Sequence, residues 1–289
     1  MVALGNFDGI HLAHQKLFEI TRKLAKQLKG TPCVYTFVPH PVKMLSPQSA
    51  PSLICTPKQK IKLIEQSKIK VLILEPFVPD FAHLSPEDFL EKILLKKIGA
   101  AGIVAGYDFT FGAKRTGNTE ILEKFCKSEN IPCKILEAQL LKETLISSSQ
   151  IRSMIQKGLV ERAIELLGRP FEMIGTVVKG EGIGLSLGFP TANLLPENEL
   201  IPSTGIYATQ VKLGLNTYPS VTNIGFRPTF GGKKLTIETH LLRFKKKIYG
   251  KTMCVRFFKK IREERPFSSA QELTEQIKKD VEIAKKILK

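Results

Sequence analysis

The chain has 289 residues, of which 43% are hydrophobic and 25% charged, and its formal net charge is +17. This composition is that of a soluble globular protein and excludes wholesale disorder, while the length predicts about two domains. No apolar run approaches the roughly 20 residues of a membrane-spanning helix. The five cysteines lack CxxC spacing, which argues against a disulfide framework or a structural zinc site.

The first half of the chain alternates short apolar strands with amphipathic helices. Strands are expected at 2–4, 33–37, 71–74, 103–105 and 134–136. The helix after the first strand has an apolar face made of Leu17, Phe18, Thr21, Leu24 and Leu28. A further helix opens at Pro86 and ends at Gly99. This alternation predicts a parallel sheet covered on both faces, in which ligands bind beyond the carboxyl ends of the strands.

The pattern changes in the second half. Residues 147–168 predict one helix, closed by Gly168. Apolar and polar residues then alternate at 205–213, 235–242 and 253–257, which is typical of an antiparallel barrel or sandwich. A last helix begins at a capping box formed by Ser269 and Glu272. We therefore expect an α/β domain over residues 1–169 and a small antiparallel β-barrel domain with a C-terminal helix over residues 170–289.

The stretch GNFDGIHLAHQ, from Gly5 to Gln15, occupies the turn from the first strand into the first helix. Glycines let the backbone approach a ligand, and a helix N-terminus offers free N–H groups to an anion. His11 and His14 lie on the same side of the first helical turn, where two imidazole donors suit charge that develops on phosphorus. Taken alone, the pair is explained equally well by one histidine that caps the turn and one that packs.

The match extends beyond these two histidines. The stretch resembles the HxGH signature of the nucleotidylyltransferase superfamily, in the form found in FAD synthetases, and TFVPHP, GYDFTFG and ISSSQIR agree in the same order. The resemblance implies a Rossmann-like α/β nucleotidyltransferase domain with catalytic residues His11, His14 and Arg152. It also implies that the nucleotide is bound by Gly5, Phe7, Asp8, Gly9, Ser148 and Ser149, and the flavin by Asp108. Ala13 stands where such enzymes usually carry glycine.

A second motif, KGEGIGLSLGFPTANL, spans residues 179–194. Its glycines alone are explained by a β-turn, and a lone strand glutamate such as Glu238 is ordinarily a solvent-facing residue. LGFPTANL nevertheless resembles the riboflavin kinase signature, and NIGFRPTF at 223–230 and TIETHLL at 236–242 agree with it. The resemblance implies Glu238 as the general base for the 5′-hydroxyl of riboflavin. It further implies nucleotide binding by Gly180, Gly182, Gly188 and Pro190, flavin binding by Asn223, and Mg²⁺ binding by Thr191 and Asn193.

The two signatures together cover nearly the whole chain, which resembles the bacterial bifunctional riboflavin kinase/FMN adenylyltransferases, also called FAD synthetases. The resemblance implies ATP-dependent phosphorylation of riboflavin to FMN, then adenylylation of FMN to FAD with release of pyrophosphate. The expected partners are small molecules: ATP with Mg²⁺, and riboflavin, FMN and FAD as substrate and product. Met1 to Leu4 run directly into the glycine motif without the basic and hydrophobic regions of a signal peptide, so we expect a cytoplasmic protein. We expect neither a membrane nor a nucleic acid as a partner. The oligomeric state is not predicted.

Two other functions stay open at this point. If Ala13 crowds the ATP, the protein is a riboflavin kinase with a structural N-terminal domain. Alternatively, it is a flavin-binding regulator that uses its basic surface, densest at 243–247 and 259–265, on nucleic acid. That surface lacks an aromatic-studded RNA-binding strand, a zinc finger or a recognition helix. Only the regulator predicts salt-sensitive nucleic-acid binding without ATP consumption.

Overall fold

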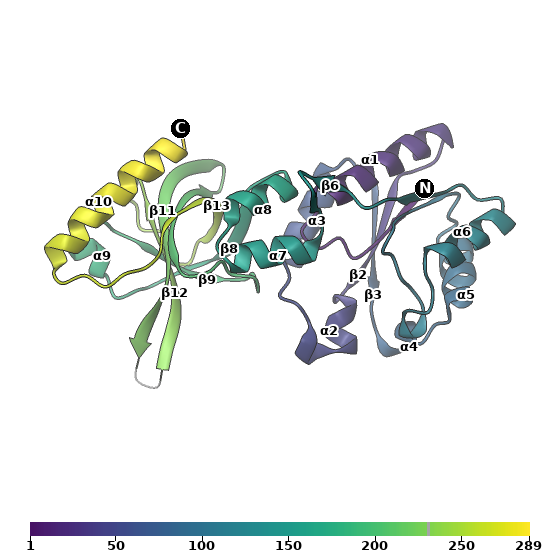
Figure 1. The fold of residues 1–289 in the computed structure, drawn as a ribbon, viewed down its shortest axis with the longest axis horizontal. Helices are drawn as coiled ribbons and strands as arrows, with labels where there is room; N and C mark the ends of the chain where they lie inside the picture. Colours follow the sequence, from purple (N-terminus) through teal and green to yellow (C-terminus); the bar gives the residue numbers. More distant parts are fainter. Residues whose placement is uncertain (230–231) are drawn as a thin grey trace. The chain divides into compact units, whose positions relative to one another are not determined.

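The computed structural model of the chain describes residues 1–229 and 232–289 (Figure 1). By its internal contacts the chain divides into two compact units, Met1–Ser147 and Ser148–Lys289. This division assigns residues 148–169 to the second unit, whereas the sequence pattern groups them with the first. The functional boundary between residues 169 and 170 stays a prediction.

The first unit is built on a five-stranded parallel sheet with the strand order β3–β2–β1–β4–β5. The strands are β1 (Val2–Leu4), β2 (Cys33–Val38), β3 (Val71–Pro76), β4 (Ile103–Gly106) and β5 (Cys133–Leu136). Each predicted strand is present, and the predicted parallel sheet is confirmed. Because the strands run in one direction, the loops that follow β1, β2 and β4 leave the same edge of the sheet.

Helices cover both faces of this sheet (Figure 1). The main ones are α1 (Leu12–Gln27), α3 (Pro57–Gln66), α5 (Pro86–Asp88), the π-helical η2 (Phe89–Lys97) and α6 (Thr119–Ser128). Short segments are α2 (Pro41–Leu45), η1 (Pro47–Ser49), α4 (Pro79–Ala82), η3 (Ala113–Arg115), β6 (Leu140–Leu141) and β7 (Thr144–Leu145). Leu17 and Phe18 of α1 pack with Ile64 of α3 on one face. Leu94 of η2 and Leu122 of α6 pack on the other face. Burial of each such side chain contributes about 1.5–3 kcal/mol.

The prediction that Leu28 lies on the buried face of α1 is wrong. Leu28 is the C-cap of the helix and its side chain is 42% exposed, because the helix ends at Gln27. Thr21 is buried as predicted, and its hydroxyl donates a hydrogen bond to the carbonyl of Leu17, 2.8 Å away. The helix expected from Pro86 is confirmed as α5 followed directly by η2.

The single helix predicted over 147–168 is also wrong, because the structure has two. Helix α7 covers Ser148–Gln156 and α8 covers Val160–Leu167. Between them Gly158 adopts φ +75°, and a side chain there would lie 2.9 Å from the hydroxyl of Tyr207. The glycine therefore breaks the helix where the backbone approaches the barrel. The predicted stop at Gly168 is confirmed, with φ +70°.

The second unit contains a closed barrel with the strand order β10–β11–β12–β9–β8–β13, in which neighbouring strands are antiparallel. Its strands are β8 (Phe171–Val178), β9 (Ala192–Pro196), β10 (Gly205–Leu213), β11 (Asn216–Thr229), β12 (Gly232–Leu241) and β13 (Thr252–Arg262). Phe171, Met173 and Val255 are fully or almost fully buried. The barrel alternative of the sequence prediction is confirmed.

Helix α10 (Ala270–Ile287) packs on the outside of the barrel, as Figure 1 shows. Val281 and Ala284 contact the outer face at Ile206 of β10. The buried carboxylate of Asp280 accepts hydrogen bonds from the guanidinium of Arg262, at 2.8–3.1 Å. A buried charge that is paired in this forked geometry fixes the position of the helix on the barrel.

Candidate active sites

Three sequence motifs meet at the carboxyl edge of the parallel sheet. GNFDGIH follows β1, TFVPHP runs from the end of β2 into α2, and GYDFTFG follows β4. Since β1 lies between β2 and β4, these three segments are neighbours. This is the edge at which open α/β sheets bind ligands, as the sequence pattern predicts. Asp108 of the third motif is exposed there, so its carboxylate is accessible.

The turn after β1 has an unusual backbone. Phe7, Gly9 and Ile10 have φ values of 49°, 84° and 43°. These values lie in the left-handed region, which residues other than glycine rarely adopt. Asp8 is 3% exposed, and its carboxylate accepts hydrogen bonds from the backbone N–H groups of Ile54, at 3.0 and 3.1 Å, and Cys55, at 3.2 Å. Asp8 therefore ties this turn to the segment that precedes α3.

His11 and His14 lie together at the start of α1. His11 is the N-cap, 4% exposed, and its Nδ1 accepts a hydrogen bond from the backbone N–H of His14 at 3.4 Å. The two rings are stacked, with centroids 3.5 Å apart, and the edge of Phe7 packs at 5.2 Å from His14. Because Nδ1 of His11 accepts, the neutral ring carries its proton on Nε2, which makes Nε2–H a donor. His11 can therefore cap the helix through Nδ1 and donate a hydrogen bond to a ligand through Nε2–H.

The predicted phosphate ligands Ser148, Ser149 and Arg152 lie in the first two turns of α7. Ser148 and Arg152 are four residues apart, so both lie on one side of this helix. Both are partly buried and Ser149 is exposed. Helix α7 belongs to the second compact unit, and the role of these three residues stays a prediction.

A row of polar residues crosses three strands of the barrel. Glu238 of β12 lies directly opposite Asn193 of β9 on one side and Asn223 of β11 on the other. Opposed residues of antiparallel strands place their side chains on the same face. Thr239 points into the barrel, where its hydroxyl lies 3.0 Å from that of Thr222, so the row lies on the outer face.

Two members of this row are shielded from solvent. Glu238 is 9% exposed, which differs from an ordinary strand glutamate at the surface. Among the described residues, Oδ1 of Asn223 is buried without a hydrogen-bond partner. A buried acceptor of this kind favours a ligand that brings a hydroxyl or N–H donor. The sequence-predicted residues Asn193, Asn223 and Glu238 are therefore brought together. The segment 223–230 ends at Phe230, which lies outside the described residues.

The glycine-rich segment packs against this row. A side chain at Gly180 would collide with the amide of Asn193, so the close approach of the two backbones requires glycine. Gly182 and Gly188 have φ values of 80° and 83° beside the short helix α9 (Ile183–Ser186). The carbonyl of Pro190 lies 2.9 Å from Nδ1 of His240.

The donor set around Thr191 and Asn193 fits Mg²⁺. The two side chains offer a hydroxyl and an amide oxygen, which are hard ligands, and Gly180 leaves no side chain between the loop and Asn193. No cluster of three or more His, Cys, Asp and Glu suited to a metal occurs among residues 1–229 and 232–289. Two protein oxygens are typical of a magnesium ion whose remaining ligands come from phosphates and water.

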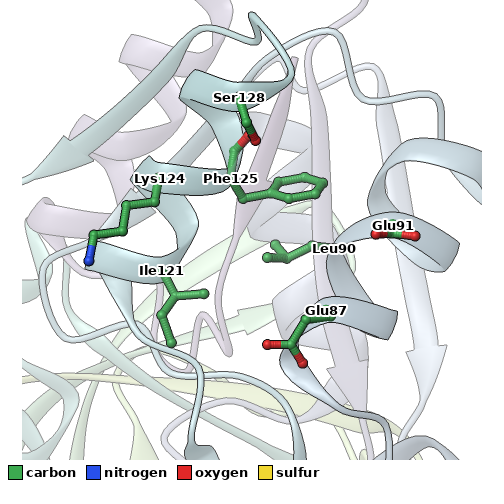
Figure 2. A pocket seen from close by; sticks show the side chains of 7 residues that line it. All are labelled: Glu87, Leu90, Glu91, Ile121, Lys124, Phe125 and Ser128. Atoms are coloured by element: carbon green, nitrogen blue, oxygen red, sulfur yellow. The ribbon is translucent and has the colours of Figure 1, made fainter.

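A pocket of about 300 Å³ lies elsewhere in the first unit, between η2 and α6 (Figure 2). Leu90, Ile121 and Phe125 form its apolar floor, and Glu87, Glu91, Lys124 and Ser128 complete its lining. None of the sequence-predicted site residues lines it. The pocket is therefore distinct from both candidate sites.

Sequence reasoning missed two residues that touch the motifs. Lys60 of α3 is 7% exposed and donates a hydrogen bond from Nζ to the carbonyl of Asn6, 2.8 Å away. His240 holds Pro190 and packs its ring at 5.5 Å from Phe189. The alternation of β12 contained a signal for His240, because it shares the face of Glu238. Nothing in the sequence distinguishes Lys60 from the other lysines of α3.

Comparison with known proteins assigns both units. A family model for FAD synthetase matches residues 1–150, and one for riboflavin kinase matches residues 167–288. The chain is 37% identical over 289 residues to a bifunctional riboflavin kinase/FMN adenylyltransferase of Buchnera aphidicola from Schizaphis graminum, covering 99% of this chain and 93% of the relative. The chain belongs to this bifunctional family.

Other members of the riboflavin kinase/FMN adenylyltransferase family are also similar over nearly their full length. The Bacillus subtilis protein is 38% identical and the Escherichia coli K12 protein 31% identical, each covering 97% of this chain and 90% of the relative. A crystal structure from Streptococcus pneumoniae, titled a macrolide-efflux protein, superposes with a TM-score of 0.90 at 31% identity, over 98% of this chain and 93% of that chain. The predicted fold class, a Rossmann-like α/β unit followed by a barrel, is thereby confirmed.

Within the part of the chain that the structure describes, no helix is long and apolar enough to cross a membrane.

Proposed function

We propose that the protein makes FAD from riboflavin in two ATP-dependent steps. Riboflavin is phosphorylated to FMN at the barrel, and FMN is adenylylated to FAD at the sheet edge. The observation that carries this proposal is the row formed by Asn193, Glu238 and Asn223, which joins three separate motifs on one face. The names of the relatives and the two family models support both steps.

In the first step Glu238 is the general base. The 5′-hydroxyl oxygen of riboflavin attacks the γ-phosphorus of ATP while its proton passes to the carboxylate of Glu238, and the bond to ADP breaks. A positioned base contributes about 10²–10⁴-fold to such a step. The buried acceptor Oδ1 of Asn223 supports its role in flavin binding, since riboflavin carries several hydroxyl and N–H donors.

ATP and magnesium complete this site. Gly180, Gly182, Gly188 and Pro190 border the ATP phosphates, where a loop without bulky side chains allows backbone N–H groups to face the oxygens. Thr191 and Asn193 hold Mg²⁺, which offsets the negative charge of the phosphates when it is bound.

In the second step a phosphate oxygen of FMN attacks the α-phosphorus of a second ATP and pyrophosphate leaves. The FMN phosphate is already ionised, so no base is required and catalysis depends on positioning and on stabilisation of charge. His11 and His14 donate to the oxygens of the α-phosphate. The other residues of the FAD synthetase motifs bind the substrates of this second step: Gly5, Phe7, Asp8, Gly9, Ser148, Ser149 and Arg152 on the nucleotide side, and Asp108 on the flavin side.

The alanine between the two histidines is compatible with this role. Ala13 is the second residue of α1 and has a helical backbone, for which alanine is the most favourable residue. We place the functional domains at residues 1–169 and 170–289, in a cytoplasmic protein whose partners are riboflavin, FMN, ATP and Mg²⁺. Nucleic acid is not among them.

One incubation tests the proposal. The full chain is incubated with riboflavin, ATP and Mg²⁺, the flavins are separated, and the reaction is repeated with EDTA in place of Mg²⁺. FMN and FAD formed in sequence support both steps. Loss of both products in EDTA supports a requirement for Mg²⁺. FMN without FAD identifies a riboflavin kinase whose first unit is structural. No ATP consumption together with salt-sensitive nucleic-acid binding identifies a regulator.

A further inference from the structure

A buried lysine lies directly beneath the turn that presents His11 and His14. Lys60 of α3 is 7% exposed, although most lysines extend into solvent. Its Nζ donates a hydrogen bond to the carbonyl oxygen of Asn6, 2.8 Å away, and the same oxygen accepts from the hydroxyl of Thr36 at 3.1 Å. The Asn6 carbonyl is thus held by one donor from α3 and one from β2.

This carbonyl belongs to the peptide that sets the position of Phe7. Phe7 has φ 49° and its ring packs against His14 at 5.2 Å and against Phe18 at 4.9 Å. Such a backbone persists only where surrounding contacts fix it. Because the Asn6 carbonyl and the Phe7 nitrogen share one peptide plane, a donor at that carbonyl restrains the rotation that carries the Phe7 ring.

Lys60 lies close to a second buried ionisable group, the carboxylate of Asp8. Burial lowers the pKa of Lys60 below its ordinary value, and the nearby carboxylate of Asp8 opposes this shift. Asp8 belongs to the same turn and is itself bound by the N–H groups of Ile54 and Cys55. Lys60 and Asp8 therefore both fix the turn from the side of α3, one through the Asn6 carbonyl and the other through the N–H groups that precede α3.

We propose that Lys60 is a positioning residue for the adenylylation of FMN. Its ammonium holds the Asn6–Phe7 peptide, the peptide holds the Phe7 ring, and the ring sets the stacked pair of His11 and His14. The inference rests on the proposed function of the first unit. Lys60 acts through the turn and does not touch the substrates.

The test uses Lys60→Met in the full chain, which keeps the length of the side chain and removes the donor. We expect kcat for FAD formation from supplied FMN to fall about 10- to 100-fold, because small displacements of catalytic groups have effects of this size. KM for ATP and FMN should stay within threefold, and riboflavin phosphorylation in the same chain should stay within twofold. Lys62→Met makes the same change at an exposed position of α3 and should match the parent.

A second readout does not depend on activity. Ring ¹H–¹⁵N spectra of the histidines, assigned with His11→Asn and His14→Gln, should show shifted signals for His11 and His14 in Lys60→Met and unchanged signals in Lys62→Met. If the parent forms no FAD, the proposed function fails, while these spectra still test the link from Lys60 to the rings. Unchanged ring signals, parent-like kcat, or an equal loss of both activities would each overturn the inference.

Should Lys60→Met not fold, Thr36→Val removes the other donor to the same carbonyl at nearly constant shape. We expect a several-fold fall in kcat for adenylylation and shifts of the same two rings. Lys60→Arg keeps a cationic donor and should therefore retain more adenylylation activity than Thr36→Val. Parent-like kinetics and spectra for Thr36→Val would contradict the inference.

Discussion

Glu238 of β12 lies directly opposite Asn193 of β9 in the barrel, and both side chains are on its outer face. We expect Glu238→Gln to lower riboflavin phosphorylation by roughly 10²–10⁴-fold, because the amide keeps the shape of the side chain and cannot accept the hydroxyl proton. Adenylylation of supplied FMN should continue. Glu275→Gln, at an exposed position of α10, is the control. Kinase activity within a few-fold of the parent would place the base elsewhere.

The histidine pair predicts the opposite pattern of activities. His11→Asn keeps a side-chain acceptor at the N-cap and removes the imidazole, so the helix start should be retained. We expect FMN adenylylation to fall on the order of 10²-fold or more, the effect of removing one preorganised donor. Riboflavin phosphorylation should be nearly unchanged. His83→Ala removes an exposed histidine of the same unit and should leave both rates unaltered. Equal losses in both activities would indicate misfolding.

The contact between Gly180 and Asn193 gives a prediction about magnesium and ATP. A methyl group in Gly180→Ala would displace the Asn193 amide, so we expect KM for Mg²⁺–ATP in the kinase step to rise about tenfold, within the range of one lost hydrogen bond to a charged group. KM for riboflavin should change little. Gly30→Ala is the control, because no atom lies closer than 4.0 Å to the added carbon. An unaltered KM would show that Asn193 is not a ligand.

Much of the fold could be predicted because its signals are local. Strands such as Ile103–Gly106 are continuous apolar runs, and the alternation in Gly205–Leu213 marks a half-buried strand. The break between α7 and α8 could not be predicted, because one glycine within a helical pattern is often tolerated. At Gly158 an added Cβ would meet Ser203 and Tyr207, which are distant in the sequence, and no local pattern reports those contacts.

The candidate sites also could be predicted only in part from the sequence. The motifs located Glu238 and Asn193, but their direct opposition depends on the register between β12 and β9, which hydrogen bonding between distant segments sets. Lys60 was not predicted at all. A lysine on an amphipathic helix is ordinarily exposed, and only the packing of α3 against the turn shows that this one is buried.

His240 provides the last prediction, because it connects the strand of Glu238 to the loop that precedes Thr191. Its Nδ1 lies 2.9 Å from the carbonyl of Pro190, and its ring meets Phe189 edge-on at 5.5 Å. His240→Phe keeps the aromatic contact and removes the hydrogen bond, whereas His240→Gln can keep the bond and loses the ring. We expect both variants to raise KM for Mg²⁺–ATP several-fold in riboflavin phosphorylation, and His240→Ala, which loses both the ring and the hydrogen bond, to raise it most. Adenylylation of FMN serves as the internal control and should be unaffected. Single variants that all match the parent would show that the loop is positioned without His240.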